Sequence, residues 1–176
     1  MLYMFFAAGF EETEAVGALD MLRRGEIEVK SVGVGGKSIT GSHDITVVCD
    51  LDDAGVSFEG LAGIVLPGGM PGTLNLEKSA VVRSAIEYCV QNDLLIAAIC
   101  AAPSILGRAG LLEGKRYTCY PGFEQGLVGD YTGERVQRDG KLITGKGPGC
   151  TIPFAIEVIR VLRGDEIAAQ VEGKLQ

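Results

Sequence analysis

The sequence lacks the residues that metal, disulfide and nucleotide sites require. His43 is the only histidine among 176 residues, and the five cysteines are an odd number with no pair at Cys-x-x-Cys spacing. We therefore expect no metal site, and free thiols in a reducing cytoplasm rather than a disulfide framework. Neither a G-x-G-x-x-G fingerprint nor a P-loop lysine pattern is present, which argues against a phosphate-binding loop.

Positive charge and long apolar runs are also scarce. The chain has 16 Lys and Arg against 23 Asp and Glu, a net charge of -7. An acidic surface repels nucleic acid and anionic membranes, so we expect neither as a partner. No apolar run is long enough to span a bilayer. The apolar start, 1–10, has no basic leader and continues into Glu11-Glu12. This pattern favours a buried first strand over a signal peptide, and we therefore expect a cytoplasmic location.

Strand-like and helix-like segments alternate along the chain. Strands are predicted at Leu2–Ala8, Glu28–Gly33, Leu61–Leu66, Leu94–Ile99 and Arg116–Cys119, with hairpins at 37–49 and 136–144. Helices are predicted at Thr13–Arg24, Ser79–Gln91, Ala101–Ala109, Thr151–Leu162 and Glu166–Lys174. This order is typical of α/β proteins with right-handed crossovers. We expect a single domain over residues 1–176: a flavodoxin-like, doubly wound, mostly parallel sheet with helices on both faces, a three-layer sandwich.

The apolar run Leu94–Ile99 ends on Cys100, and a helical pattern starts directly after it. A cysteine at such a turn lies over the carboxyl end of its strand, where open α/β sheets bind ligands. The amides and dipole of a following helix favour the thiolate, which is the nucleophilic form. Small residues follow the cysteine, and the turn from strand to helix is similar to the nucleophile elbow of hydrolases. The alternative is a small buried filler, a common setting for free cysteine.

Three further segments follow predicted core strands and should meet at the same sheet edge: Gly9–Glu14, Leu66–Gly69 and Thr118–Pro121. The acids of the first either complement a helix dipole or direct a carboxyl at the thiolate. Since two anions cannot sit in contact, such a carboxyl must be protonated. The glycines of the second form a plain turn, or an oxyanion hole together with the amide of Ala101. The third supplies Tyr120, either a packing residue or a phenol that faces substrate.

The motifs occur in a fixed order along the chain. Gly-x-Glu-Glu-x-Glu at 9–14, Leu-Pro-Gly-Gly at 66–69 and Ala-Ala-Ile-Cys-Ala-Ala-Pro at 97–103 precede Gly-Pro-Gly at 147–149 and Ala-Ala-Gln-Val at 168–171. Together they resemble the ThiJ/PfpI superfamily, specifically the branch of the Parkinson's-associated protein deglycase and its bacterial relatives. The resemblance extends over essentially the whole chain.

This resemblance implies roles for individual residues. It assigns the reactive cysteine to Cys100 and its protonated carboxyl partner to Glu14. It assigns the oxyanion amides to Gly69, which follows Gly68, and to Ala101. Family members form homodimers with the cysteine near the subunit interface. Their activities include cofactor-free conversion of methylglyoxal to lactate, repair of glyoxal-modified groups, redox sensing and chaperone behaviour, so no cofactor is expected.

The sequence departs from the family at Tyr120, where relatives often carry histidine. A phenol with a pKa of about 10 cannot replace imidazole as a base at neutral pH. Cysteine peptidase chemistry therefore lacks its base unless His43 reaches the site. His43 falls in the predicted hairpin, where it is either simply solvated or, in a dimer, close to the partner's site.

Two functions remain in view. The first is an enzyme that acts on small dicarbonyls, with the Cys100 thiolate as nucleophile and Glu14 as proton shuttle. The second is a redox-responsive or protective protein in which oxidants attack the same thiolate. Cysteine peptidase activity is disfavoured by the missing base. A role in thiazole biosynthesis, suggested only by the historical family name, has no matching phosphate site.

Overall fold

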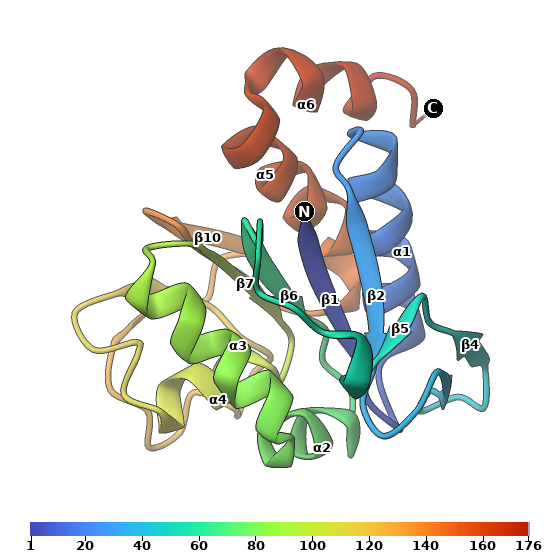
Figure 1. Ribbon diagram of the computed structural model, residues 1–176. Coiled ribbons are helices and arrows are strands. Elements are labelled where there is room, and N and C mark those ends of the chain that lie inside the picture. The colour runs from blue at the N-terminus through green and yellow to red at the C-terminus, as the bar shows by residue number, and fades with distance from the viewer. Residues whose placement is uncertain (176) are drawn as a thin grey trace.

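The computed structural model describes residues 1–175 and is built on a seven-stranded sheet (Figure 1). Its strand order is β10-β11-β7-β6-β1-β2-β5. The bounds are β1 Leu2–Phe6, β2 Val29–Gly33, β5 Leu51–Asp52, β6 Gly63–Leu66, β7 Leu95–Ile99, β10 Val136–Asp139 and β11 Leu142–Gly145. All neighbours are parallel except β10 and β11, which form an antiparallel hairpin. Every residue of β1, β6 and β7 is buried, as expected of central strands in a parallel sheet.

Helices cover both faces of this sheet (Figure 1). One face carries α1 Glu12–Arg24, α5 Thr151–Arg163 and α6 Asp165–Glu172, and the other carries α2 Gly72–Lys78, α3 Ala80–Gln91 and α4 Pro103–Arg108. Each face has its own apolar core, centred on Phe6 and Phe154 in one layer and on Phe5 and Leu66 in the other. The alternation of side chains along β1 explains this division. The predicted flavodoxin-like three-layer arrangement is confirmed.

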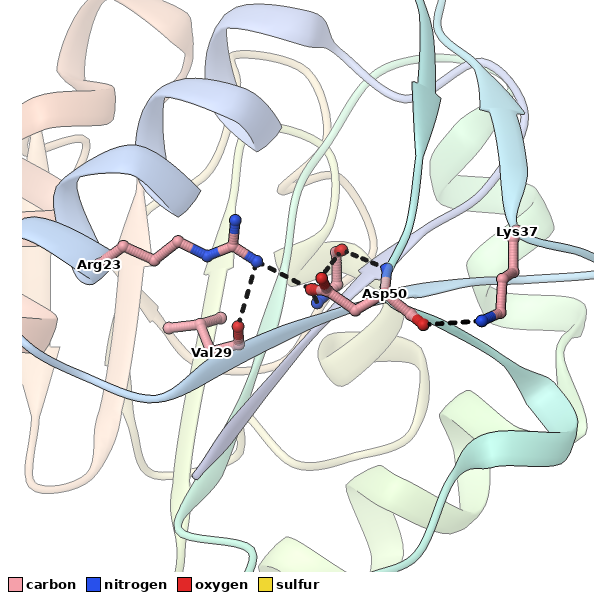
Figure 2. Close-up of polar contacts among 5 residues, drawn as sticks. Arg23, Val29, Lys37 and Asp50 are labelled. Carbon is pink, nitrogen blue, oxygen red and sulfur yellow. Dashed lines mark hydrogen bonds and ion pairs between the residues drawn. The ribbon is translucent and has the colours of Figure 1, made fainter.

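A small hairpin lies outside the main sheet and packs over the start of α1. It consists of β3 Ser38–Thr40 and β4 Thr46–Val48, paired antiparallel as predicted. Asp50, just after β4, fastens the hairpin to the sheet edge (Figure 2). One of its carboxylate oxygens accepts from the Ser31 amide and hydroxyl and from Arg23, each at 2.8 Å. Burial opposes ionisation of Asp50, but the Ser31 hydrogen bonds and the Arg23 charge outweigh it and lower its pKa.

Two local predictions were wrong, and one helix was not predicted. The segment Gly72–Lys78, which the sequence left unassigned, forms α2. The helix after Cys100 begins at Pro103 rather than at Ala101, since proline favours the first helical position and the two alanines form the preceding turn. Arg116–Tyr117, β8, is not a core strand.

In the part of the chain that the structure describes, strand β8 pairs only with β9, Asp130–Tyr131, in a separate two-stranded sheet. It has no place beside β11, because β11 is already hydrogen-bonded to β7 on one side and to β10 on the other. The loop Thr118–Pro121 therefore does not follow a strand of the main sheet. Among the described residues, 1–175, no helix has the length and apolar character needed to cross a membrane.

Candidate active site

The candidate site lies where the strand order changes direction. From β1 the chain continues to β2 on one side, whereas β6, β7 and β11 lie on the other. Ligands of open α/β sheets bind at such a switch point, outside the carboxyl ends of the strands. The loops after β1 and β6 are joined there, since the Glu11 N–H donates to the Gly68 carbonyl at 2.9 Å. The predicted meeting of these segments is confirmed.

Cys100 forms the turn at the end of β7. Its backbone has a φ of 64°, in the left-handed region that residues with a side chain seldom adopt. Two hydrogen bonds of 2.8 Å hold this conformation, one from the Cys100 N–H to Gly145 and one from the Tyr120 N–H to the Cys100 carbonyl. A strained turn that is fixed on both sides is typical of a nucleophile elbow. Cys100 is partly exposed, whereas the other four cysteines are buried.

Glu14 is the acid that meets Cys100. It lies in the first turn of α1 and has no exposed surface. Glu11 caps that helix, because its carboxylate accepts from the Glu14 N–H at 2.7 Å. Oxygen Oε2 of Glu14 accepts from the Gly68 N–H at 2.9 Å, and Oε1 is buried and has no hydrogen-bond partner among residues 1–175.

Gly68 and Gly69 bring the two groups together. A Cβ atom at Gly68 would lie 2.6 Å from Cys100 Cβ and 2.8 Å from Glu14 Oε2, so only glycine fits between them. Gly69 has a φ of 92°, which also favours glycine. The N–H groups of Gly69 and Ala101 both stabilise the Cys100 sulfur as an anion. The two amides are those expected to form an oxyanion hole, and that role stays a prediction.

Burial governs the charge of this pair. It raises the pKa of Glu14 to about 7, although the neighbouring Cys100 thiol and the Gly68 amide act in the opposite direction. Burial and the Glu14 carboxylate also raise the pKa of the Cys100 thiol, while the Gly69 and Ala101 amides lower it. The surroundings thus oppose two negative charges in contact. The expected Cys100 thiolate depends on Glu14 holding the proton, and it stays a prediction.

His43 lies in the hairpin and pairs with Glu12 of its own chain. Its ring Nδ1 is 3.0 Å from Glu12 Oε2, and its backbone N–H donates to Oε1 at 2.6 Å. Burial opposes ionisation of Glu12, but the hydrogen bonds from His43 and Ser42 outweigh it and lower its pKa to about 2. Hydrogen bonding to Glu12 raises the pKa of His43. His43 therefore acts first as an anchor of the hairpin, which the sequence did not indicate.

Three side chains offer the geometry of a metal site within residues 1–175. One ligand atom each from Glu11, Glu12 and His43 lies within 4.8 Å of the others. Glu11 already caps α1, and Glu12 already binds His43, so hydrogen bonding accounts for the cluster without an ion.

Tyr120 is half-exposed and borders the site on the side of β11. Its ring would contact a Cβ at Gly147 at 3.2 Å and meets Phe123 edge-on with ring centroids 6.4 Å apart. Neighbouring Cys119 is buried, and burial raises its thiol pKa to about 12. These contacts support Tyr120 as a wall of the site and Cys119 as an inert thiol.

The family follows from sequence comparison. Residues 2–161 match the DJ-1/PfpI family. The chain belongs to the DJ-1/PfpI family. It is 36% identical over 172 residues to the protein dj-1beta of Drosophila melanogaster, covering 96% of this chain and 92% of that one. The crystal structure of Drosophila melanogaster DJ-1beta superposes with a TM-score of 0.94 at 34% identity, covering 99% of this chain and 96% of that one.

One DJ-1/PfpI relative carries an activity in its name. The Caenorhabditis elegans protein called glutathione-independent glyoxalase DJR-1.2 is 29% identical over 159 residues, covering 89% of this chain and 84% of that one. The predicted family membership is therefore confirmed, together with the fold.

Proposed function

We propose that this protein is a cofactor-free, cysteine-dependent enzyme that converts small 2-oxoaldehydes such as methylglyoxal to 2-hydroxy acids. The observation that carries the proposal is the buried contact of Glu14 with Cys100 at the strained end of β7, with two backbone amides on the sulfur. A relative named as a glyoxalase supports the same reaction class.

The pair holds one proton in the reactive state. Two anions in contact inside a buried site are unfavourable, so one group stays protonated. Because the Gly68 N–H occupies Oε2 of Glu14, the free Oε1 is the oxygen suited to carry the proton. A protonated Glu14 no longer repels the thiolate and donates a hydrogen bond to it. Cys100 is then ionised while Glu14 is neutral.

The reaction then needs only groups of this chain and water. The Cys100 thiolate adds to the aldehyde carbon, and the carbonyl oxygen takes a proton from Glu14 to give a hemithioacetal. The Glu14 carboxylate removes the proton from that carbon and returns it to the neighbouring carbon, and the hydroxyl proton of the hemithioacetal moves to the former ketone oxygen. The aldehyde carbon is thereby oxidised to a thioester, while the ketone carbon is reduced to an alcohol. The amides of Gly69 and Ala101 stabilise the enediolate. Water hydrolyses the resulting thioester, which releases lactate and restores the thiol.

The test is lactate formation from methylglyoxal by the purified protein. We expect turnover by the wild type, none above background by Cys100→Ala, and nearly unchanged turnover by Cys89→Ala, a buried cysteine in α3. Equal activity of the wild type and Cys100→Ala contradicts the proposal.

A second function, oxidant sensing, is favoured by the exposure of the cysteines. Cys100 alone of the five is accessible to peroxide, and a thiolate is the form that oxidants attack. Mass spectrometry after mild peroxide should find two added oxygens on Cys100 and none on the four buried thiols. Such selective oxidation without turnover of any carbonyl favours sensing over catalysis, whereas equal oxidation of all five cysteines excludes it.

A homodimer remains part of the proposal. Large apolar side chains are exposed on α1, on the hairpin and at the start of α5, namely Val16, Ile45, Val48 and Ile152. Contacts link α1 with both α5 and the hairpin, so these side chains come from neighbouring elements. Light scattering should give twice the chain mass for the wild type and a lower mass for Val48→Lys. A cytoplasmic location stays a prediction from the sequence.

A further inference from the structure

A cavity of about 550 Å³ lies next to the candidate active site. Tyr120, Arg135, Lys146 and Pro148 are among its lining residues. Tyr120 links it to the nucleophile, since its N–H donates to the Cys100 carbonyl at 2.8 Å. The residue before Lys146, Gly145, accepts the Cys100 N–H at the same distance. A molecule that reacts at Cys100 therefore has a neighbouring space for a second group.

Two cations face each other on the wall of this cavity. Val136 of β10 pairs with Gly145 of β11, and the Lys146 N–H extends the ladder by donating to the Arg135 carbonyl at 2.9 Å. Arg135 and Lys146 thus lie directly opposite one another. Like charges in this relation destabilise an antiparallel pair.

No carboxylate neutralises them within residues 1–175. Arg135 donates to the Gly149 carbonyl at 2.7 Å and Lys146 to the Gly133 carbonyl at 3.0 Å, and neither forms an ion pair. Two other cations of the same hairpin do form ion pairs, Arg138 with Glu157 and Lys141 with Asp93. In a chain of net charge -7, two opposed cations without acid partners create a local positive potential in the cavity.

We propose that this Arg135–Lys146 cavity binds an anionic group, a carboxylate or a phosphate, of a molecule whose carbonyl reacts at Cys100. The substrate class is then a 2-oxoaldehyde with an acidic tail, an assignment that rests on the proposed function for its reactive end. An anion between the two cations relieves their repulsion. The arginine fork fixes its orientation, and the lysine adds a point charge.

Matched alkylating agents test the proposal without any turnover. Iodoacetate and iodoacetamide attack the same thiolate and differ in charge. The rate of alkylation of Cys100 by iodoacetate, divided by the rate with iodoacetamide, should fall about three- to tenfold in Arg135→Gln and in Lys146→Gln. Each variant removes one positive charge that attracts the anionic reagent. Lys141→Gln, at the opposite end of β11, removes the same net charge and should leave the ratio unchanged. An unchanged ratio in both cavity variants overturns the proposal.

A second measurement is independent of the thiol. In the Cys100→Ala protein, the amide resonances of Gly147 and Gly149 should shift saturably on titration with inorganic phosphate or with acetate. The stronger of the two binders identifies the preferred anion. The shifts should disappear when Arg135 and Lys146 are both replaced by glutamine. If neither phosphate nor acetate shifts these resonances, the proposal is overturned, even if Cys100 of the wild type is reactive.

A substrate comparison separates the two proposals. 4,5-Dioxopentanoate carries the reactive end of methylglyoxal and a carboxylate tail. Its kcat/KM relative to that of methylglyoxal should fall about tenfold in Lys146→Gln, mainly through KM. Anion binding without turnover of either substrate supports the cavity assignment and contradicts the proposed function. Turnover of both with an unaltered ratio supports the function and contradicts the cavity assignment.

Discussion

Glu12 and Glu14 lie two residues apart in α1, yet their surroundings shift them in opposite directions. The pKa of Glu12 is lowered to about 2, because hydrogen bonds from His43 and Ser42 outweigh its burial. The pKa of Glu14 is raised to about 7, because burial outweighs its hydrogen bonds. One helix start thus carries an acid that fixes structure and an acid suited to proton transfer. The number and charge of donors around each carboxyl decide its role, not its place in the sequence.

Replacing each acid by its amide should give the largest difference between the two residues in the rate of lactate formation. Glu14→Gln should lower the rate of lactate formation by about 10²–10⁴-fold, since it removes the acid and base beside Cys100. Glu12→Gln should change the same rate by less than about threefold, since Glu12 binds His43 of the hairpin and not Cys100. Equal losses in the two variants would mean that the cluster acts as a whole, against a special role for Glu14.

The two acids should also affect the pH dependence of stability in opposite directions. The pKa of Glu14 rises on folding from 4.5 to about 7, so its stabilising contribution is complete below pH 4.5 and is lost as the pH rises through 7. The pKa of Glu12 falls on folding from 4.5 to about 2, so its contribution is complete above pH 4.5 and is lost as the pH falls towards 2.

Urea unfolding across this pH range measures both effects. Relative to Glu14→Gln, the free energy of unfolding of the wild type should decrease on the order of 3 kcal/mol between pH 4.5 and 7. Relative to Glu12→Gln, it should decrease only on acidification below pH 4.5. Parallel curves for the wild type and Glu14→Gln would show that Glu14 titrates alike in the folded and unfolded chains.

Replacing Gly68, which lies between Cys100 and Glu14, should have a smaller effect on activity and stability. Gly68→Ala inserts a methyl group 2.6 Å from Cys100 Cβ and 2.8 Å from Glu14 Oε2. We expect a loss of about 1–3 kcal/mol in the free energy of unfolding, and slower turnover because the pair is forced apart. Gly173→Ala, just after α6, is the matched control, since Gly173 has a φ of -64° and a Cβ there would lie no nearer than 3.3 Å to its closest neighbour, the Ala169 carbonyl oxygen. Full activity of Gly68→Ala would argue against direct contact between Glu14 and Cys100.

The sequence predicts the reactive end of this site better than its surroundings. The apolar run into Cys100 and the paired glycines after β6 follow from local pattern, because buried parallel strands and tight turns leave strong signatures. The deeper burial of Glu14 compared with Glu12 does not follow from local pattern, because it depends on which neighbours cover each carboxyl. The facing cations Arg135 and Lys146 are also invisible in the sequence, because the hairpin register alone places them opposite. Strand β8 was misassigned because propensity does not reveal that β11 has no free edge.

His43 should give the smallest effect. Because it is exposed and bound to Glu12 of its own chain, His43→Gln should leave lactate formation unchanged and lower the thermal midpoint slightly. The raised pKa of His43 means that its contribution is complete below its ordinary value of 6.5 and is lost at higher pH, so the difference from the wild type should shrink on going from pH 5.5 to 9. A marked loss of activity instead would favour the alternative that the sequence left open, a histidine that reaches the cysteine of a partner subunit. Mixing His43→Gln with Cys100→Ala then decides the matter: in a dimer of the two variants, the only intact cysteine faces the only intact histidine, so recovered activity identifies a site shared between subunits.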